Sequence, residues 1–379
     1  MAGRWNHSWT GLVDEVLDAD LCTGCSGCVI VCPQDVLTLN PDTWRPELAG
    51  EAWFEGDVRN CLHGEERGCT LCTRACPRFK AWRIDADMAK WNELSDPEDV
   101  LGVHRAVLLV EATDAAMAEA GQDGGLGSAM LAYAMEHDII DAALVSYVDE
   151  GQRPRPGVAR TRDELLASAG SRYTYSANTL AIDETADDER LGLISVSCQV
   201  TIPAVAYGRK ARKLAGRFGL VIGLLCSKTF TDEIYQELFD ERYGIARDKV
   251  VKVNIKGKLQ VWHDTGGDEL GYTEIPLKEA HEWSRPGCSH CPDFSAEHAD
   301  VSLGGIGRFP GKTLTIVRTD LGEEIIDRMV RDGLITVSDA YEHDPDAVNL
   351  AIRLAKRQRA RWPEERMGQL MEVGSAEPG

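Results

Sequence analysis

From about residue 100 onwards, short apolar runs alternate with segments of helical periodicity. The helical segments, for example SAMLAYAMEHD and AVAYGRKARKLAGRFG, repeat their apolar residues with a period of about 3.6. The short runs are bounded by Gly and polar residues, which favours strands. They are AVLLV (106–110), DAALVS (141–146), GLISVS (192–197), LVIGLLC (220–226), KVVKVN (249–254) and KTLTIVRT (312–319). The alternation predicts an α/β domain with a largely parallel sheet.

The first 95 residues lack this alternation and contain eight cysteines. After Pro77, the segment RFKAWRIDADMAKWNELSDPEDVLG predicts a helix and then a polar linker, which suggests a domain boundary near residue 95. We therefore expect three parts, covering residues 1–95, 96–335 and 336–379.

The chain has 379 residues and a formal charge of -21, which is enough length for two or three domains. This charge argues against nucleic-acid binding, because phosphate neutralisation requires a basic face. The opening stretch has no apolar run of signal-peptide length, and the longest apolar run, FGLVIGLLC (218–226), is far shorter than the roughly 20 residues that span a bilayer. We expect a cytoplasmic protein without a transmembrane segment, which leaves peripheral association with a membrane open.

The 12 cysteines point to metal, because disulfides are rare in the cytoplasm. The stretch CTGCSGCVIVCP has the C-x2-C-x2-C-x3-C-P spacing of bacterial ferredoxins, at Cys22, Cys25, Cys28 and Cys32. In that pattern three thiolates bind one [4Fe-4S] cluster and the fourth binds the other cluster of a pair. The second motif that this requires is CLHGEERGCTLCTRACP, whose first spacing is lengthened to seven residues, at Cys61, Cys69, Cys72 and Cys76.

The ferredoxin pattern assigns two sets of four ligands. The first set is Cys22, Cys25, Cys28 and Cys76, and the second is Cys61, Cys69, Cys72 and Cys32. Zinc is the alternative, but it prefers two well-separated CxxC pairs and has no use for an exchanged fourth cysteine or for the prolines. We therefore predict an α+β protein that begins with a bacterial-type, two-cluster ferredoxin domain.

Four cysteines remain. Cys198 directly follows one predicted strand and Cys226 closes another, and sites in open α/β sheets lie at the carboxyl ends of strands. Cys288 and Cys291 form a CxxC in GCSHCPDF. From spacing alone, two interpretations stay open: a third [4Fe-4S] cluster, or two buried thiols beside a CxxC that is a redox pair or half a zinc site.

Several longer motifs carry a family resemblance. DGGLGSAMLAYAMEHDIIDAALV (123–145) is similar to a Gly-Gly-x-x-Thr helix start, with Ser128 in place of Thr, and GSRYTYSAN (170–178) to a Gly-Ser-Lys/Arg-Tyr segment. SCQVTIPAVA (197–206) matches a Cys-Gln turn, with Ser197 in place of the usual Pro; GLLCSKTF, RPGCSHCPDFSAEHADVSLGGIG and TIVRT complete the set. Over roughly residues 1–335 the chain resembles the family of beta subunits of coenzyme F420-reducing hydrogenases and dehydrogenases, in versions that carry an N-terminal two-cluster ferredoxin.

The resemblance implies that the second domain is an α/β domain that binds FAD and a third [4Fe-4S] cluster. It further implies coenzyme F420 as the substrate and a protein partner that donates or accepts electrons. The implied cluster ligands are Cys198, Cys226, Cys288 and Cys291. The residues that it suggests for the flavin pocket are Gly124, Gly125, Ser128, Gly170, Ser171, Arg172, Tyr173 and Asp293.

Each of these flavin candidates can be explained either by cofactor binding or by local structure alone. A glycine-rich helix start offers free N–H groups to a phosphate, and Arg172 offers a bidentate donor. A tight turn, a solvated arginine and a local cap by Asp293 explain the same residues without a ligand. We predict no catalytic side chain, because hydride transfer between stacked rings is governed by position.

The implied cofactors fit together chemically. Coenzyme F420 is a 5-deazaflavin that exchanges two electrons as hydride, whereas a [4Fe-4S] cluster takes one, so a flavin must stand between them. The predicted function is hydride transfer between reduced F420 and FAD, with single electrons relayed through three clusters to or from a partner. The alternatives are a flavin-less electron-transfer adaptor and a reductase of another acceptor, such as a chlorophyll-type ring or NAD(P). No G-x-G-x-x-G follows a strand, which argues against the nicotinamide alternative.

The C-terminal stretch DAVNLAIRLAKRQRARWPEERMGQL (346–370) is basic and amphipathic, on an acidic protein. It docks either on an acidic partner or on the acidic body of its own chain, which offers the nearest complementary charge.

Overall fold

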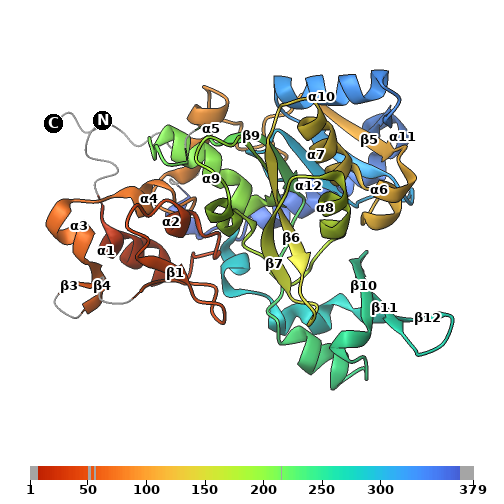
Figure 1. Cartoon of the computed structure of the whole chain (residues 1–379), viewed down its shortest axis with the longest axis horizontal. Coiled ribbons are helices and arrows are strands. Elements are labelled where there is room, and N and C mark those ends of the chain that lie inside the picture. The colour runs from red at the N-terminus through yellow and green to blue at the C-terminus, as the bar shows by residue number, and fades with distance from the viewer. Residues whose placement is uncertain (1–6, 50–52, 55–56, 215, 368–379) are drawn as a thin grey trace.

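The structure is a computed structural model, and it describes residues 7–49, 53–54, 57–214 and 216–367. Figure 1 shows a large unit of sheet and helices with a smaller N-terminal unit beside it. A separate three-stranded sheet lies below the large unit in the same view. The cysteines of the two N-terminal motifs all belong to the smaller unit.

An eight-stranded sheet in the order β15-β5-β14-β13-β9-β8-β6-β7 forms the centre of the large unit. Val107 and Leu109 of β5 (Ala106–Ala112) pack against the core under α11 (Ala340–His343) and α12 (Pro345–Arg359). Val110 packs into the core on the other face, under α7 (Leu126–Glu136) and α10 (Asp320–Arg331). Helices therefore cover both faces of the sheet, which explains why its strands are near-continuous apolar runs. The strands are β5 (Ala106–Ala112), β6 (Ala142–Val148), β7 (Pro154–Ala159), β8 (Leu191–Val196), β9 (Phe218–Leu224), β13 (Val301–Gly304), β14 (Thr313–Val317) and β15 (Ile335–Asp339).

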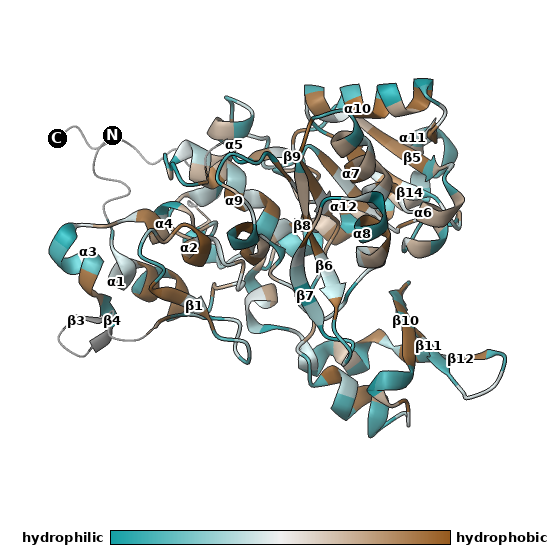
Figure 2. Cartoon of the chain, in the orientation of Figure 1, coloured by the Kyte–Doolittle hydropathy of each residue, from teal (hydrophilic) through white to brown (hydrophobic). Residues whose placement is uncertain are grey.

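Helix α10 is amphipathic where it covers the sheet, whereas α7 and α9 (Ser197–Gly208) are largely apolar and buried. In Figure 2, α10 at the edge of the molecule alternates between hydrophilic and hydrophobic turns, and β5 beside it is mainly hydrophobic. Buried Ile325, Ile326 and Met329 form the inner face of α10. The helices are α6 (Ala115–Ala120), α7 (Leu126–Glu136), α8 (Arg162–Ser168), α9 (Ser197–Gly208), α10 (Asp320–Arg331), α11 (Ala340–His343) and α12 (Pro345–Arg359).

All six predicted strands are present, but the prediction of a largely parallel sheet is wrong. Only the pairs β6–β8, β8–β9 and β9–β13 are parallel, and the pairs β6–β7, β13–β14, β14–β5 and β5–β15 are antiparallel. The short connections from β6 to β7 and from β13 to β14 make hairpins, and hairpins join antiparallel strands. The run 249–254 falls outside this sheet altogether. It forms β10 (Val250–Ile255), which pairs with β11 (Lys258–Asp264) and then β12 (Leu270–Pro276) over its own small core.

The N-terminal unit consists of short elements around its cysteines. Two antiparallel hairpins, β1 (Leu37–Leu39) with β2 (Pro46–Leu48) and β3 (Trp53–Phe54) with β4 (Asp57–Cys61), separate the two cysteine motifs. The helix predicted after Pro77 is α5. The helices are α1 (Trp9–Leu12), α2 (Gly27–Ile30), α3 (Leu62–Arg67), α4 (Leu71–Arg74) and α5 (Trp82–Lys90).

The two units share their hydrophobic cores. One core joins Phe79 and Trp82 to Val205 of α9 and to Trp362 near the C-terminus. Another joins Cys25 and Ala75 to residues of α9. Gly208 allows α5 and α9 to approach closely, since a Cβ there would stand 2.8 Å from the carbonyl oxygen of Asp85. The N-terminal unit is therefore packed onto the large unit and does not hang from a linker.

The basic C-terminal stretch packs against its own chain, as the fold-back interpretation predicts; its last residues, 368–370, lie outside the described residues. Buried Val348, Ala351 and Ala355 of α12 join the core beneath the sheet, and Arg359 pairs with buried Glu297. Among the described residues no helix, α12 included, has both the length and the apolar character needed to cross a membrane.

Trp82 is the largest fully buried side chain, at 1 % exposure, and it lies where the two units meet. Replacing it with Ala removes an aromatic ring from the shared core. We expect Trp82→Ala to cost about 3–5 kcal/mol and to lower the melting temperature of the cluster-loaded protein by roughly 5 °C under anaerobic conditions. Met88→Ala is the matched control, because Met88 lies on the same helix and is 46 % exposed. Equal melting temperatures for the two variants would show that Trp82 does not stabilise the contact between the two units.

Candidate functional site

The eight N-terminal cysteines surround two hollows in the small unit. One hollow is lined by three thiols of the second motif together with one of the first: Cys61, Cys69, Cys72 and Cys32. The other is lined by three thiols of the first motif together with one of the second: Cys22, Cys25, Cys28 and Cys76. The structure thus brings together the two sets that the ferredoxin pattern exchanges between motifs.

Local backbone conformation aims the first motif at its hollow. Gly24 and Ser26 have positive φ values of 66° and 62°, so the chain turns sharply between successive cysteines before α2 begins. The N–H of Gly24 donates to Sγ of Cys22 at 3.4 Å. Gly24 is needed here, because a Cβ would stand 2.5 Å from the carbonyl oxygen of Trp44.

Burial and mutual repulsion both disfavour the ionised forms of these thiols. Burial raises the pKa of Cys22 to about 11, and the neighbouring Cys25 adds to the shift. Burial raises the pKa of Cys76 to about 12, again with Cys25 and Cys22 adding to it. Four ionised thiols this close together would repel one another, unless a cationic group between them offsets the repulsion. The donor set of each hollow fits a [4Fe-4S] cluster, which takes four thiolates.

The last four cysteines also meet, although three elements supply them. Cys198 lies in the first turn of α9, Cys226 follows β9, and Cys288 lies in the short 3-10 helix Pro286–His290, just before Cys291. Burial raises the pKa of Cys226 well above its usual range, and the thiols of Cys288, Cys198 and Cys291 add to the shift. We call this set the third quartet and the two N-terminal sets the first quartet (with Cys22) and the second quartet (with Cys72).

The three quartets form a row. Burial raises the pKa of Cys198 to about 12, and the thiol that adds most to this shift is Cys25 of the first quartet. Burial likewise raises the pKa of Cys28 in the first quartet, and one contributor is Cys72 of the second quartet. The first quartet therefore lies between the third and the second.

Three buried side chains fill the joint between the first and third quartets. The hydroxyl of Tyr175 donates to the carbonyl of Gly24 at 3.2 Å and lies 3.8 Å from Sγ of Cys198. The guanidinium of Arg285 lies 3.6 Å from the centre of the Tyr175 ring. Arg78 donates to Sγ of Cys291 at 3.3 Å. Sequence analysis missed all three; the signal for Arg78 and Arg285 was their position directly beside the cysteine motifs.

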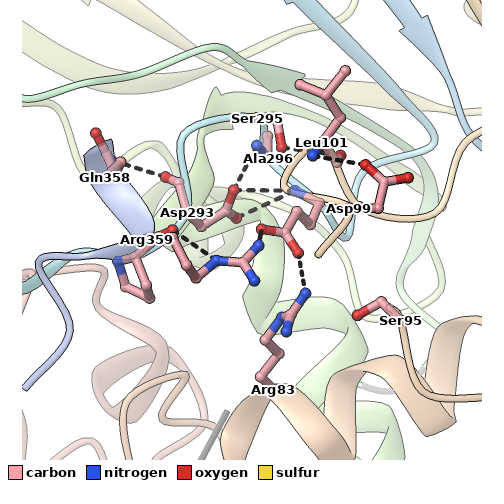
Figure 3. A network of polar contacts seen from close by, with 12 residues as sticks. Arg83, Ser95, Asp99, Leu101, Asp293, Ser295, Ala296, Gln358 and Arg359 are labelled. Carbon is pink, nitrogen blue, oxygen red and sulfur yellow. Dashed lines mark hydrogen bonds and ion pairs between the residues drawn. The ribbon is translucent and has the colours of Figure 1, made fainter. Parts of the chain in front are cut away.

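A buried ionic network holds the loop after Cys291 (Figure 3). Glu297 pairs with Arg83 of α5 at 2.7 Å and with Arg359 of α12. Burial alone would raise the pKa of Glu297, but Arg83 and Arg359 outweigh it and bring that pKa to about 2. Arg83 and Arg359 reach the loop from different elements, so the network clamps the third quartet between the two units.

Asp293 belongs to this loop. Its carboxylate accepts from the backbone N–H of Ala296 at 2.8 Å and from that of Glu297, and its own carbonyl accepts from Gln358 (Figure 3). These contacts are those of a local cap, and the proposed cofactor contact of Asp293 stays a prediction.

The glycines of the predicted flavin loop are needed for packing. Gly124 and Gly125 have positive φ values, and a Cβ on Gly125 would stand 1.9 Å from the carbonyl oxygen of Met117. A Cβ on Gly124 would stand 2.2 Å from the carbonyl oxygen of Gly311. The pair sits directly before α7, whose first N–H groups are free of helical partners, and half-buried Ser128 lies in its first turn.

The second flavin segment lies beside this loop. A Cβ on Gly170 would stand 3.6 Å from the carbonyl oxygen of Ala120, and half-buried Ser171 follows. Burial lowers the pKa of Arg172, and its Nε is buried with no hydrogen-bond partner in the part of the chain that the structure describes. A buried guanidinium with an unused donor suits an anion such as a pyrophosphate.

Tyr173 connects this segment to the third quartet. Its hydroxyl donates to Asn254 of β10 at 3.3 Å. Burial raises the pKa of Tyr173, and the charges of Asp123 and Cys226 add to the shift. Asp123, in the loop before α7, pairs with Lys256 just after β10 at 3.0 Å. The two segments of the predicted flavin pocket thus both contact the small sheet, and the charge of Cys226 reaches the same place.

Comparison with known proteins places these features in a family. Residues 107–183 and 188–343 match the family models described as the N-terminal and C-terminal parts of the coenzyme F420 hydrogenase/dehydrogenase beta subunit, and residues 21–80 match a 4Fe-4S dicluster domain.

Individual proteins agree with these matches. Coenzyme F420 hydrogenase subunit beta of Methanothermobacter thermautotrophicus is 35% identical over 252 residues, covering 65% of this chain and 88% of the relative. A subunit of the F(420)H(2) dehydrogenase of Methanosarcina mazei is 26% identical over 334 residues, covering 86% of this chain and 87% of the relative. In the solved F420-reducing [NiFe] hydrogenase complex from Methanosarcina barkeri, a chain of 29% identity superposes with a TM-score of 0.65, covering 71% of this chain and 92% of that one. The chain belongs to the family of coenzyme F420 hydrogenase/dehydrogenase beta subunits and carries a 4Fe-4S dicluster domain at its N-terminus.

Proposed function

We propose that this protein is an oxidoreductase that transfers hydride between reduced coenzyme F420 and FAD and relays single electrons through three [4Fe-4S] clusters. When bound, the flavin supplies the exchange between two-electron and one-electron chemistry, and the clusters supply one-electron transfer. The observation that carries the proposal is the row of quartets: the hollows of the first two quartets are each lined by four thiols, Cys25 of the first quartet shares a buried core with Cys198 of the third, and Cys28 shares one with Cys72 of the second.

The residues around the inner end of the row, at the third quartet, would hold the flavin. Arg172 offers its unused donor to the pyrophosphate, and the helix start at Gly125 offers backbone N–H groups and the positive end of the α7 dipole. Ser128 and Ser171 add hydroxyl donors. Tyr173, whose hydroxyl donates to Asn254, would line the side of the flavin site that the charge of Cys226 reaches.

The relatives support F420 as the substrate and a protein as the partner. The names of two relatives specify coenzyme F420, and the solved neighbour is one chain of a multi-subunit complex. In this chain the second quartet is the outer end of the row. Trp9, His63 and Leu71 line its hollow, so we place the exchange of electrons with the partner at this side of the N-terminal unit.

The substrate is tested directly. Purified protein mixed anaerobically with reduced F420 and a viologen dye should reoxidise the deazaflavin and reduce the dye, because the quartets give electrons a route out of the flavin site. The deazaflavin and viologen absorbances are followed together, and bound FAD is measured in the same sample. Turnover with NADH but none with reduced F420 would reject this substrate, and cluster-loaded protein without flavin would favour the electron-transfer adaptor.

Arg172 tests the flavin pocket. We expect Arg172→Leu to lose FAD on dilution at least tenfold more readily than the wild type, because a buried donor to an anion has no substitute. Flavin content after gel filtration measures this. Arg155→Leu is the matched control, because Arg155 of β7 is exposed and pairs with Asp149. Equal flavin retention by the two variants would remove Arg172 from the pocket.

Two double variants that share Cys76 test the exchanged ligand sets. Cys22 and Cys76 line one hollow, so Cys22→Ser/Cys76→Ser should lose a single cluster and fall from about twelve to about eight iron atoms per chain. Cys72 and Cys76 line different hollows, so Cys72→Ser/Cys76→Ser should lose two clusters and retain about four iron atoms. The reverse order of iron contents would mean that each motif binds its own cluster.

A further inference from the structure

Arg78 is a buried cation between two quartets. It directly follows Cys76 and Pro77, and its side chain is among the largest fully buried ones, at 2 % exposure. It lines the hollow of the first quartet. Its Nη2 donates to Sγ of Cys291, in the third quartet, at 3.3 Å. One guanidinium therefore contacts the surroundings of two sets of thiols at once.

The charges around Arg78 are chiefly those of the thiols. The three that act on it most strongly are Cys291, then Cys198, then Cys25, and the carboxylate of Asp293 acts less than any of them. Two of these thiols belong to the third quartet and one to the first. The buried arginines nearby differ in this respect, because Arg83 pairs with the carboxylate of Glu297 and Arg209 with that of Asp85.

Packing alone does not require this guanidinium. Nη1 donates to the carbonyl of Pro77 at 2.5 Å, and the guanidinium lies 4.6 Å from the centre of the Trp82 ring. Nε is buried and has no hydrogen-bond partner among the residues that the structure describes. A buried guanidinium with an unused donor is costly, and an apolar side chain would fill the same volume without that cost.

We propose that Arg78 is a positioning residue for electron transfer, whose buried charge raises the reduction potentials of the clusters held by the third and first quartets. This inference rests on the proposed function, because it assumes that both quartets carry clusters. An added electron makes a cluster more negative by one charge, and a fixed cation in a low-dielectric interior favours that state. Hydrogen bonds to the ligand sulfurs act in the same direction.

The geometry predicts a graded effect along the row. The third quartet receives the hydrogen bond from Arg78, the first quartet has Arg78 in the lining of its hollow, and the hollow of the second quartet is lined by other residues. Because Arg78 acts on the clusters of both the third and the first quartet, it makes both easier to reduce by electrons from the flavin. The second quartet serves as an internal reference in the same molecule.

The test is a potentiometric EPR titration of the full-length, cluster-loaded protein without F420. Arg78→Met removes the charge and the donor but keeps an unbranched side chain against Trp82. We expect the reduction potential of the third-quartet cluster to fall by at least about 59 mV, which is a tenfold change in its one-electron reduction equilibrium. The potential of the first-quartet cluster should fall less, and that of the second should not change. Cys198→Ser and Cys72→Ser assign the signals, because they remove the third and second clusters.

Arg78→Lys keeps the charge and should retain most of the wild-type potentials, which a merely structural role would not predict. Arg78→Gln keeps a neutral donor and should lower the potentials as the Met variant does. If the Met variant does not take up its clusters, the potentials of the Gln variant are compared with those of the wild type. Arg105→Gln is the control, because Arg105 also pairs with carboxylates, those of Asp320 and Glu323, but touches none of the three quartets' hollows or sulfurs among the described residues; its potentials should equal those of the wild type. Cluster-loaded Met or Gln variants whose potentials are unchanged, or shift equally for all three clusters, overturn the role of Arg78.

The same samples separate this inference from the function on which it rests. About eight iron atoms per chain in the wild type, or no oxidation of reduced F420, would count against the proposed function. Unchanged potentials in variants with about twelve iron atoms would count against Arg78 alone.

Discussion

The packing of thiols against thiols is the constraint on which the rest of this molecule depends. Burial and the neighbouring sulfurs both raise the pKa values of Cys76, Cys198 and Cys226, so the folded chain places acidic groups where their charged forms repel one another. Without cations the raised pKa values keep these thiols protonated, and the thiolate forms that bind iron are stable only with cations between or beside the sulfurs. Iron would supply that charge inside each quartet, and Arg78 and Arg285 supply it at the joint between two of them.

The joint also explains why the N-terminal unit is built into the fold. A ferredoxin unit on a flexible linker would hold its first cluster at a variable distance from the third. Here Cys25 and Cys198 pack in one hydrophobic core, Tyr175 spans the two quartets, and Glu297 pairs with arginines from both sides. The same contacts that stabilise the interface therefore fix the spacing along the row. The C-terminal helix α12 completes the clamp through Arg359.

The flavin region is organised differently from the thiol row. Gly124 and Gly125 are explained by backbone packing, so their presence does not by itself indicate a phosphate. Arg172 is the stronger sign, because its Nε is buried and unused among the described residues. Family membership and the convergence of Tyr173, Asp123 and Cys226 then point to the same place. Asp293, which shares a motif with Cys291, caps its own loop, and its contact with a flavin stays a prediction.

The sequence by itself predicted which N-terminal cysteines line a common hollow, the six strands and the family, because cysteine spacing, apolar periodicity and motif order are local properties of the chain. It did not determine the order and direction of the strands, since these depend on which loops close as hairpins: β7 and β14 reverse the sheet that a βα alternation predicts. Nor could it identify Arg78, whose significance comes from a thiol 213 residues away. In the sequence Arg78 is an ordinary arginine after Cys-Pro, and only the tertiary structure shows that it lies between two quartets. Burial and charge act through space, so no pattern along the chain indicates them.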